Sequence, residues 1–420
     1  MRVLWVNNIA IPVIAKDMKI KHDYHGGWLT GYFDEIKKYN NIKLGICFPY
    51  KNTKKIIKGN IEKVDYYAFP KRFKNQTKID KKLDTDIEKI LIDFQPDILH
   101  VFGTEFPYSY QFVKKFNNSS KTIVNIQGLV SEIAAVYTSG IPQKFIKKNT
   151  LRDILRQDNI IKQQKKYEKR GDYECKAIKA TDNVIGRTLW DEICCKEINK
   201  KLNYFFCNEI LRNEFYCAKW NQNEIEKYSI FVSQSDYPIK GFHYMLEAMK
   251  IVKNKYPSAH LYTTGKNILK MNCKDNLRIN SYQKLIQKLI QDFKLENSIT
   301  FLENLSASEI KERYLHSNVF VSPSILENSS NSVGEAMMLG VPTIASDVGG
   351  ISSMVENGFD GIMYQFHSPK MLAYHICELF SNTKKQQLFS KNSIEKMENI
   401  YNRKNNAERL FSIYDLIKNI

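Results

Sequence analysis

The chain has 420 residues, of which 43% are hydrophobic, and it carries a formal net charge of +18. This length is too great for one ordinary hydrophobic core and predicts two domains, while the ordinary apolar content and the lack of short-period repeats argue against a disordered or fibrous protein. Charged residues interrupt every apolar run before the ~18 residues that a membrane-spanning helix needs, which argues against a transmembrane protein.

The first residues, MRVLWVNNIAIPVIAKD, predict a buried strand rather than a signal peptide. Asn7 and Asn8 interrupt the apolar stretch, and no small-residue cleavage site follows it. The eight cysteines are scattered along the chain without a C-x-x-C pair, which indicates reduced thiols. We therefore expect a cytoplasmic protein.

Strand-like and helix-like segments alternate through the first half of the chain. Short apolar runs predict strands at residues 2–8, 43–50, 96–103, 121–128 and 182–188. Helical spacing of apolar residues predicts helices at residues 27–39, 85–95, 108–116 and 151–181. This order favours a parallel sheet with helices on both faces.

Lysine and arginine concentrate in the first half. Residues 51–82 contain eleven basic and three acidic residues, and residues 144–201 contain sixteen basic and nine acidic residues. One interpretation is a solvated, lysine-rich surface. The other is a face that attracts an anionic partner, either lipid headgroups or nucleic acid, although no nucleic-acid-binding motif accompanies the charge.

The alternation restarts after a polar stretch at residues 218–228. Strands are predicted at residues 229–235, 259–265, 298–304, 318–324, 341–347 and 360–364. Helices are predicted at residues 241–256, 281–295, 307–317, 333–340 and 369–418. The fold class is therefore α/β with two doubly wound, Rossmann-like halves, and we expect ligands in a cleft between them, outside the carboxyl ends of the strands.

Two carboxylates, Glu327 and Glu335, flank a polar loop in the segment ILENSSNSVGEAMMLGVPTIASDVGG, residues 325–350. A helix predicted to begin near Ser332 offers unpaired N–H groups and a positive dipole end, which suit phosphate. Ser332 and Glu335 fit a capping box, so one interpretation is that Glu335 only caps its helix. Capping does not account for Glu327. Carboxylates on both sides of a phosphate-binding helix end favour a nucleotide sugar.

This segment resembles the E-x7-E signature of the retaining GT-B glycosyltransferases, in the family called glycosyl transferases group 1. The resemblance extends over residues 229–365 and is looser in the first half. It implies that Glu335 binds the ribose of the donor and that Glu327 approaches the transferred sugar. Backbone contacts to the sugar and the diphosphate are implied for Asn331, Ser332 and Val333.

A second segment, SQSDYPIKGF at residues 233–242, resembles the diphosphate-binding turn of the same family. Lys240 fits the lysine of that turn, a compact cation able to neutralise a departing pyrophosphate. Without the neighbouring glutamates it would be read as an exposed turn lysine. Gln234 stands where the family has an arginine, so Lys240 acts alone or together with Arg187 from the first half.

The resemblance implies further contacts in the first half. Gly26 and Gly27, in HGGW, are either a simple tight turn or a loop over the donor phosphates. Gln127 stands where many members carry a histidine; an amide cannot act as a general base, so it is expected to hydrogen-bond the sugar. Additional candidates on the cleft side are Arg187, Asn208 and Glu209. His100 is read as a buried structural histidine rather than a catalyst.

The implied domains are residues 1–220, which bind the acceptor, residues 221–395, which bind the nucleotide sugar, and residues 396–420, a C-terminal helix that packs back on the N-terminal domain. The implied reaction moves a hexose from a UDP- or GDP-linked sugar to a glycan or lipid-linked glycan in cell-surface polysaccharide synthesis. No D-x-D motif or metal-ligand spacing is present, so we expect no cofactor and no metal.

The basic first half would hold such an enzyme on the anionic, cytoplasmic face of the membrane. Two alternatives remain open. One is another enzyme of the same architecture, such as a nucleotide-sugar epimerase or a phosphorylase with a pyridoxal phosphate lysine. The other is a nucleic-acid-binding protein, which only the positive charge suggests. Because the sequence contains no nucleic-acid-binding motif, we expect no nucleic acid partner.

Overall fold

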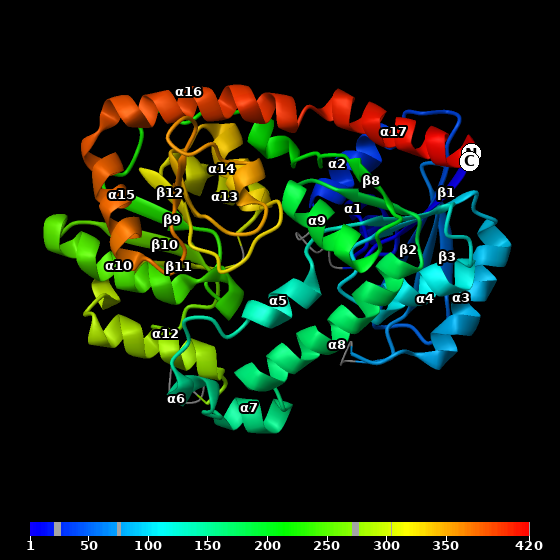
Figure 1. The fold of residues 1–420 in the computed structure, drawn as a ribbon, viewed down its shortest axis with the longest axis horizontal. Coiled ribbons are helices and arrows are strands. Elements are labelled where there is room, and N and C mark those ends of the chain that lie inside the picture. Colours follow the sequence, from blue (N-terminus) through cyan, green and yellow to red (C-terminus); the bar gives the residue numbers. More distant parts are fainter. Residues whose placement is uncertain (21–26, 74–76, 271–276, 304, 420) are drawn as a thin grey trace. The chain divides into compact units, whose positions relative to one another are not determined.

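The computed structural model describes residues 1–20, 27–73, 77–270, 277–303 and 305–419 (Figure 1). By its internal contacts the chain divides into two compact units. Unit 1 comprises Met1–Glu132, Lys166–Arg212 and Tyr401–Ile420, and unit 2 comprises Ile133–Lys165 and Asn213–Ile400. Each unit is built on its own sheet.

Unit 1 contains an eight-stranded sheet within the described residues, in the order β3-β4-β2-β1-β5-β6-β7-β8. The strands are β1 (Arg2–Val6), β2 (Lys43–Tyr50), β3 (Ile57–Ile61), β4 (Val64–Pro70), β5 (Ile98–Phe102), β6 (Thr122–Asn125), β7 (Asn183–Gly186) and β8 (Asn203–Phe206). All neighbours pair in parallel except β3, which forms an antiparallel hairpin with β4. The predicted strands of the first half are present, while β3, β4 and β8 were not predicted.

The side chains of alternate residues of β1 pack into two separate hydrophobic cores, one on each face of the sheet, as expected for a strand buried on both faces. Val3 and Trp5 pack in one core, and Leu4 and Val6 pack in the other. Helices of unit 1 cover these faces: α1 (Pro12–Asp17), α2 (Gly27–Ile36), α3 (Lys81–Phe94), α4 (Pro107–Phe116), α9 (Leu189–Ile198) and α17 (Arg403–Asn419). Helices α5 (Val130–Val136) and α8 (Ile160–Lys179) each contain a point where the chain passes from one unit to the other.

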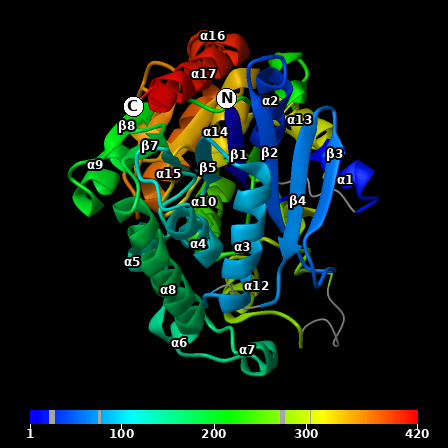
Figure 2. The same ribbon diagram turned by 90° about the vertical axis from the view of Figure 1, so that its right-hand side faces the viewer.

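The C-terminal helix α17 is part of the unit 1 core. It lies beside α2 in both views (Figures 1 and 2). Tyr414 is fully buried, and its hydroxyl accepts a hydrogen bond from Trp5 Nε1 at 2.9 Å and contacts His100 Nδ1 at 2.6 Å. The final residues of the chain therefore complete the same core that the first strand begins.

Unit 2 contains a six-stranded parallel sheet within the described residues, in the order β11-β10-β9-β12-β13-β14. The strands are β9 (Ser229–Val232), β10 (His260–Thr264), β11 (Ile299–Leu302), β12 (Val319–Ser322), β13 (Thr343–Ser346) and β14 (Ile362–Tyr364). Its longer helices are α10 (Phe242–Lys255), α12 (Ser281–Asp292), α13 (Ala307–Leu315), α14 (Asn331–Leu339), α15 (Pro369–Ser381) and α16 (Thr383–Ile400). The predicted helical tail is thus three helices, α15 to α17.

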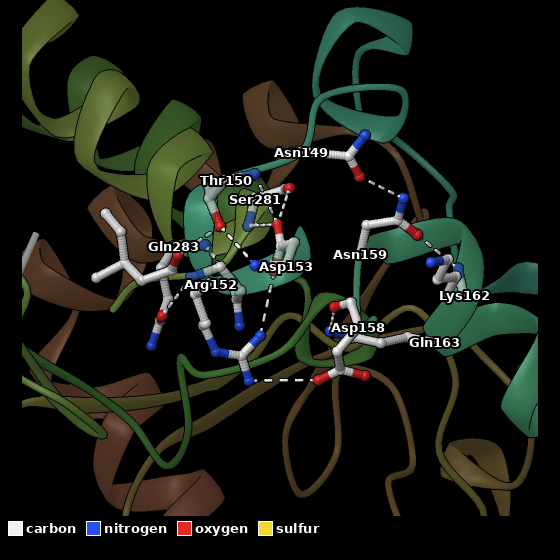
Figure 3. A network of polar contacts seen from close by, with 12 residues as sticks. Asn149, Thr150, Arg152, Asp153, Asp158, Asn159, Lys162, Gln163, Ser281 and Gln283 are labelled. Atoms are coloured by element: carbon white, nitrogen blue, oxygen red, sulfur yellow. Dashed lines mark hydrogen bonds and ion pairs between the residues drawn. The ribbon is translucent and has the colours of Figure 1, made fainter. Parts of the chain in front are cut away.

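Residues 133–165 belong to unit 2, although the sequence predicts residues 1–220 as a single domain. This segment contains two short helices, α6 (Gln143–Ile146) and α7 (Leu151–Arg156). The buried carboxylate of Asp153 accepts hydrogen bonds from the backbone N–H of Ser281, at 3.0 Å, and from the Ser281 hydroxyl (Figure 3). These bonds satisfy a charge that would be costly to bury alone, so they fix the segment to the start of α12.

The single helix predicted at residues 151–181 is interrupted. Helix α7 ends at Gln157, whose φ of 50° is left-handed, and α8 begins three residues later. Residues 213–220, which the sequence prediction assigned to the N-terminal domain, also lie in unit 2. None of the helices formed by the described residues has the length and apolar character needed to cross a bilayer.

Candidate active site

Three neighbouring strands of unit 2 deliver the predicted donor-binding loops to one edge of its sheet. Strands β9, β12 and β13 are adjacent and parallel, so their carboxyl ends meet. The loops that follow them are residues 233–241, 323–330 and 347–350. Every second-half residue in the predicted site falls on one of these loops or on the helix α14 that follows β12.

The two predicted catalytic residues, Lys240 and Glu327, contact each other. Lys240 Nζ lies 2.5 Å from Glu327 Oε1, and the Ser324 hydroxyl donates to the same oxygen at 2.8 Å. Their side chains are 20% and 12% exposed, so the pair is partly shielded from water but still reachable. A cation and a carboxylate are thus held together at the edge where a ligand of an α/β sheet is expected.

A glycine locks the Lys240 turn against the end of β12. Gly241 has a φ of +64°, and a Cβ at this position would stand 1.9 Å from the carbonyl oxygen of Pro323. Next to it, Ile325 N–H donates to the carbonyl of Ile239 at 2.8 Å. Only glycine permits both the left-handed backbone and this close approach.

The main chain of Glu327 is fixed from the β13 side as well. Its carbonyl accepts a hydrogen bond from Gly350 N–H at 3.0 Å. Gly349, with a φ of +52°, lies so close that a Cβ would stand 2.1 Å from the same carbonyl oxygen. The Ser346 hydroxyl holds the carbonyl of Ser324 at 2.5 Å. The carboxylate is therefore presented by a rigid loop.

The predicted capping box of α14 is wrong. The helix begins at Asn331 with Ser330 as its N-cap, and no side chain caps it. Ser332 lies inside the first turn, where its carbonyl accepts a hydrogen bond from the Tyr314 hydroxyl at 3.0 Å. The Ser330 and Ser332 hydroxyls instead lie 3.1 Å from each other.

The start of α14 retains the features that suit an anion. The first N–H that the helix satisfies internally is that of Gly334, which bonds the Ser330 carbonyl at 3.0 Å, so the preceding N–H groups have no partner one turn back. Asn331 Oδ1 is buried and has no hydrogen-bond partner among the described residues. Unpaired N–H groups and the helix dipole are what a phosphate group requires.

Glu335 and Val333, both on α14, differ in how far their side chains are exposed to solvent. Glu335 is the fifth residue of α14 and is only 7% exposed. The Val333 side chain is fully buried, so only its main chain is available to a ligand. In the neighbouring loop, Gln234 Oε1 accepts a hydrogen bond from the Tyr237 hydroxyl at 2.9 Å.

In unit 1 the structure brings together three of the predicted residues, at the carboxyl ends of β6, β7 and β8. Arg187 Nη1 lies 2.7 Å from Glu209 Oε2, and Arg187 Nη2 donates to the carbonyl of Gln127 at 3.3 Å. Both charged side chains are buried. Burial lowers the pKa of Arg187, but the nearby Glu209, Tyr401, Asp191 and Tyr32 together more than offset this effect, and the net pKa is raised.

The other predicted residues of unit 1 have structural contacts of their own. The Gln127 amide donates to Asn125 Oδ1 at 2.7 Å, and the Asn208 carbonyl accepts a bond from the Tyr32 hydroxyl. Gly27 begins α2, and Gly26 lies outside the described residues. His100 is buried, as predicted, and burial lowers its pKa to about 3.

The model of the family Glycosyl transferases group 1 matches residues 213–396. Residues 213–396 belong to this glycosyltransferase family. The matched region contains β9 to β14 and α14, and thus the whole of the Lys240–Glu327 site. The resemblance on which the sequence prediction rested is therefore confirmed at the level of the family.

Curated relatives match part of the chain, and solved structures share the fold of nearly all of it. Spore coat protein SA of Bacillus subtilis is 28% identical over 42% of this chain, and the chain spans about half of that protein's length, 46%. Sucrose-phosphate synthase from Thermosynechococcus elongatus (TM-score 0.69) and Anabaena HepE in complex with UDP and glucose (TM-score 0.66) are each 14% identical, covering 99% of both chains. The predicted fold class, two Rossmann-like GT-B domains, is confirmed.

The sequence prediction did not single out one acidic residue of unit 1, Glu105. It follows β5 and lies against Gly103, whose φ is +86° and whose added Cβ would stand 2.1 Å from Glu105 Oε2. Burial raises the pKa of Glu105 to about 7. The available signal was a Gly-Thr-Glu run directly after a buried strand, a position typical of ligand loops in α/β sheets.

The raised pKa of Glu105 predicts a measurable pH effect. The unfolded chain releases this proton near the ordinary value of 4.5 and the folded chain near 7, so the folded state binds more protons between these values and stability falls as pH rises through them. Relative to the wild type, Glu105→Gln should therefore gain free energy of unfolding from about pH 4.5 to 7, measured by urea titration. Glu408→Gln, at an exposed position on α17, is the control. Parallel curves for wild type and Glu105→Gln would contradict the assignment.

In the part of the chain that the structure describes, no three His, Cys, Asp or Glu side chains lie close enough together to hold a metal ion. The seven cysteines that the structure describes are free thiols.

Proposed function

We propose that this protein is a retaining hexosyltransferase that moves a sugar from a UDP- or GDP-linked donor to a glycan or lipid-linked glycan in cell-surface polysaccharide synthesis. The observation that carries this proposal is the Lys240–Glu327 ion pair, 2.5 Å long, on a glycine-locked loop beside the open start of α14. A cation, a carboxylate and a helix N-terminus lie together beside the carboxyl ends of the strands of one sheet. Together with Glu335, this set matches the three parts of a nucleotide sugar: Lys240 and the helix N-terminus match the diphosphate, Glu327 the sugar and Glu335 the ribose.

Each group has a role that follows from its chemistry. Lys240 has three donors, so it can keep its contact with Glu327 while it binds the diphosphate, and it stabilises the charge that develops as the sugar bond breaks. The main-chain N–H groups of Asn331, Ser332 and Val333 bind the same diphosphate. Glu327 accepts hydrogen bonds from the sugar hydroxyls and Glu335 from the ribose hydroxyls. Gln234 adds a neutral contact beside Lys240.

Two positively charged features, Lys240 and the α14 dipole, supply the charge stabilisation that a divalent cation supplies in other transferases. We therefore propose transfer without a metal. We place no protein nucleophile at the sugar: the acceptor hydroxyl attacks from the face that the nucleoside diphosphate leaves, and its proton passes to the departing phosphate oxygen.

Unit 1 is proposed to recognise the acceptor. The Arg187–Glu209 pair supports this role indirectly, because it holds the Gln127 carbonyl and thereby orients the end of β6. Arg187 and Glu209 then act as positioning residues for Gln127, and Asn208 is proposed as a further acceptor contact. Gly27, the first residue of α2, is proposed to contribute a main-chain contact to the donor phosphates.

The comparisons support the nucleotide-sugar donor. Anabaena HepE, which shares this fold, was solved with UDP and glucose. The family match lies on the half of the chain that contains Lys240 and Glu327.

A panel of nucleotides tests the proposal. UDP, GDP, ADP and CMP, each with a matching sugar nucleotide, are added to the full chain and the melting temperature is recorded, followed by donor hydrolysis for the nucleotides that bind. Ligand at 100 times its Kd stabilises by about 2.7 kcal/mol, which raises the Tm of a domain of this size by several degrees. Hydrolysis should persist in EDTA. If neither uridine nor guanosine diphosphates raise the Tm, the proposal is wrong.

A further inference from the structure

Helix α7 exposes three aliphatic side chains on one face. Leu151, Ile154 and Leu155 are 51%, 61% and 76% exposed. Their spacing of three and four residues places them side by side on a helix. Single exposed apolar residues are ordinary, but a cluster on a six-residue helix is a feature of binding surfaces.

The exposure of these side chains is not the result of a loose helix. Thr150 and Asp153 form a capping box that closes the first turn of α7. The same Asp153 carboxylate is bound by the N–H and the hydroxyl of Ser281, and Thr150 Oγ1 donates to the carbonyl of Ile279 at 2.8 Å (Figure 3). The polar side of α7 is therefore tied into unit 2, and its apolar side is held outward.

Exposed positive charge lies on the same segment of the chain as the aliphatic cluster, residues 133–165. Six exposed basic residues lie on the same segment: Lys144, Lys147, Lys148, Arg156, Lys162 and Lys165. The segment has two carboxylates, and both are used internally. Asp153 is buried, and Asp158 pairs with Arg152 at 3.3 Å. We call these aliphatic and basic residues the α6–α7 patch.

We propose that the α6–α7 patch docks the protein on an anionic lipid surface, with Leu151, Ile154 and Leu155 entering the boundary between headgroups and acyl chains. The exposed basic side chains complement the negative charge of such a surface, and long lysine stems allow the charged ends to remain at headgroup level. Amphipathic elements with this division of residues lie in membrane interfaces. A protein partner is the weaker fit, because the exposed apolar side chains include none of the aromatic anchors that dominate protein interfaces.

This inference deepens the proposed function by placing the enzyme where a lipid-linked acceptor would lie, and that connection rests on the proposed function. The docking itself rests on the α6–α7 patch alone. It also places part of the predicted basic charge, because residues 144–165 belong to unit 2, while residues 51–82 and 166–201 belong to unit 1.

The test is co-sedimentation of the full chain with two kinds of vesicle, phosphatidylcholine alone and one part phosphatidylglycerol to two parts phosphatidylcholine, at low and high ionic strength. We expect binding to the anionic vesicles that weakens with salt. The triple variant Leu151→Ser/Ile154→Ser/Leu155→Ser should lower that binding about tenfold or more, because it removes the apolar contribution. Lys144→Gln/Lys147→Gln/Lys148→Gln should flatten the salt dependence.

Leu388→Ser is the matched control, since Leu388 is 51% exposed on α16, outside the α6–α7 patch, and it should bind vesicles as the wild type does. Thermal melts establish that each variant is folded. Equal binding to both vesicle types, or unchanged binding in the aliphatic triple variant, would overturn the proposal. So would a concentration-dependent dimer that the triple variant abolishes, because a second copy would then cover the patch.

Donor hydrolysis measured without vesicles separates this result from the proposed function. Loss of vesicle binding with hydrolysis intact bears on the α6–α7 patch alone. A wild type that binds anionic vesicles but hydrolyses no sugar nucleotide supports the docking proposal and overturns the proposed reaction.

Discussion

Lys240→Met is expected to lower donor turnover by about 10²–10³-fold, the loss typical when one preorganised group that stabilises developing charge is removed. Lys240 is the cation of the site, and its ammonium lies 2.5 Å from Glu327. The methionine side chain keeps most of the volume and removes the charge. Sugar-nucleotide hydrolysis and glycosyl transfer measure the effect, and Lys266→Met, at an exposed lysine after β10, is the matched control.

The contact between Lys240 and Glu327 leads to a second expected result, which concerns the double variant. Residues that touch couple energetically, so the losses in Lys240→Met and Glu327→Gln should not add in the double variant. Turnover in the double variant should be close to that of the poorer single variant. Full additivity of the two losses would show that the two residues act separately. Near-normal turnover in Lys240→Met would show that the lysine has no role in the reaction.

Gly241→Ala is expected to destabilise unit 2 and abolish nucleotide binding. The added Cβ would stand 1.9 Å from the Pro323 carbonyl in a backbone with a φ of +64°. A left-handed non-glycine residue costs about 1–2 kcal/mol, and forcing apart packed main chain costs about 1–3 kcal/mol more. Denaturant unfolding measures the loss, and the nucleotide-induced rise in Tm reports on the site.

Gly358→Ala separates the strain of a left-handed backbone from the steric overlap with Pro323. Gly358 has a φ of +82°, but an added Cβ there meets nothing within 4 Å. This variant should lose only the strain of about 1–2 kcal/mol and keep its nucleotide response. Equal losses in the two variants would mean that the contact with Pro323 is unimportant.

The regular parts of the fold could be predicted from the sequence because they follow local patterns. Buried parallel strands such as β9 and β12 are short apolar runs, and their order alternates with helices. Strand β3, IKGNI, was missed because a charged residue, a glycine and an asparagine interrupt its apolar pattern. As an edge strand it needs only one buried neighbour, β4, which leaves little signal in the sequence.

The start of α14 shows the limit of motif rules. Three serines, Ser329, Ser330 and Ser332, precede or open the helix, and the S-x-x-E spacing favoured Ser332. The structure places the N-cap at Ser330, while the Ser332 carbonyl binds the hydroxyl of Tyr314, a residue from another helix. A contact of this kind cannot be read from local sequence. The Lys240–Glu327 pair, which joins two loops, was predicted only as two separate roles.

The division into units depends on contacts that are still more distant in sequence. Asp153 finds its partner Ser281 across 128 positions, and no local pattern signals that pairing. Residues 133–165 were therefore assigned to the half in which they occur along the chain. Charge counting likewise identified the basic residues of that segment without identifying the surface to which they belong.

The partnership of Tyr414 with Trp5 has a consequence for the timing of folding in the cell. The two residues are 409 positions apart, so the core around β1 lacks α17 until the intervening positions have been synthesised. At 5–20 residues per second, that interval is roughly 20–80 s. All the strands of unit 2 emerge from the ribosome before Tyr414 does. Unit 1, which contains β1, is thus completed only after the strands of unit 2 have been made, and in the meantime its core around β1 lacks the cover of α17.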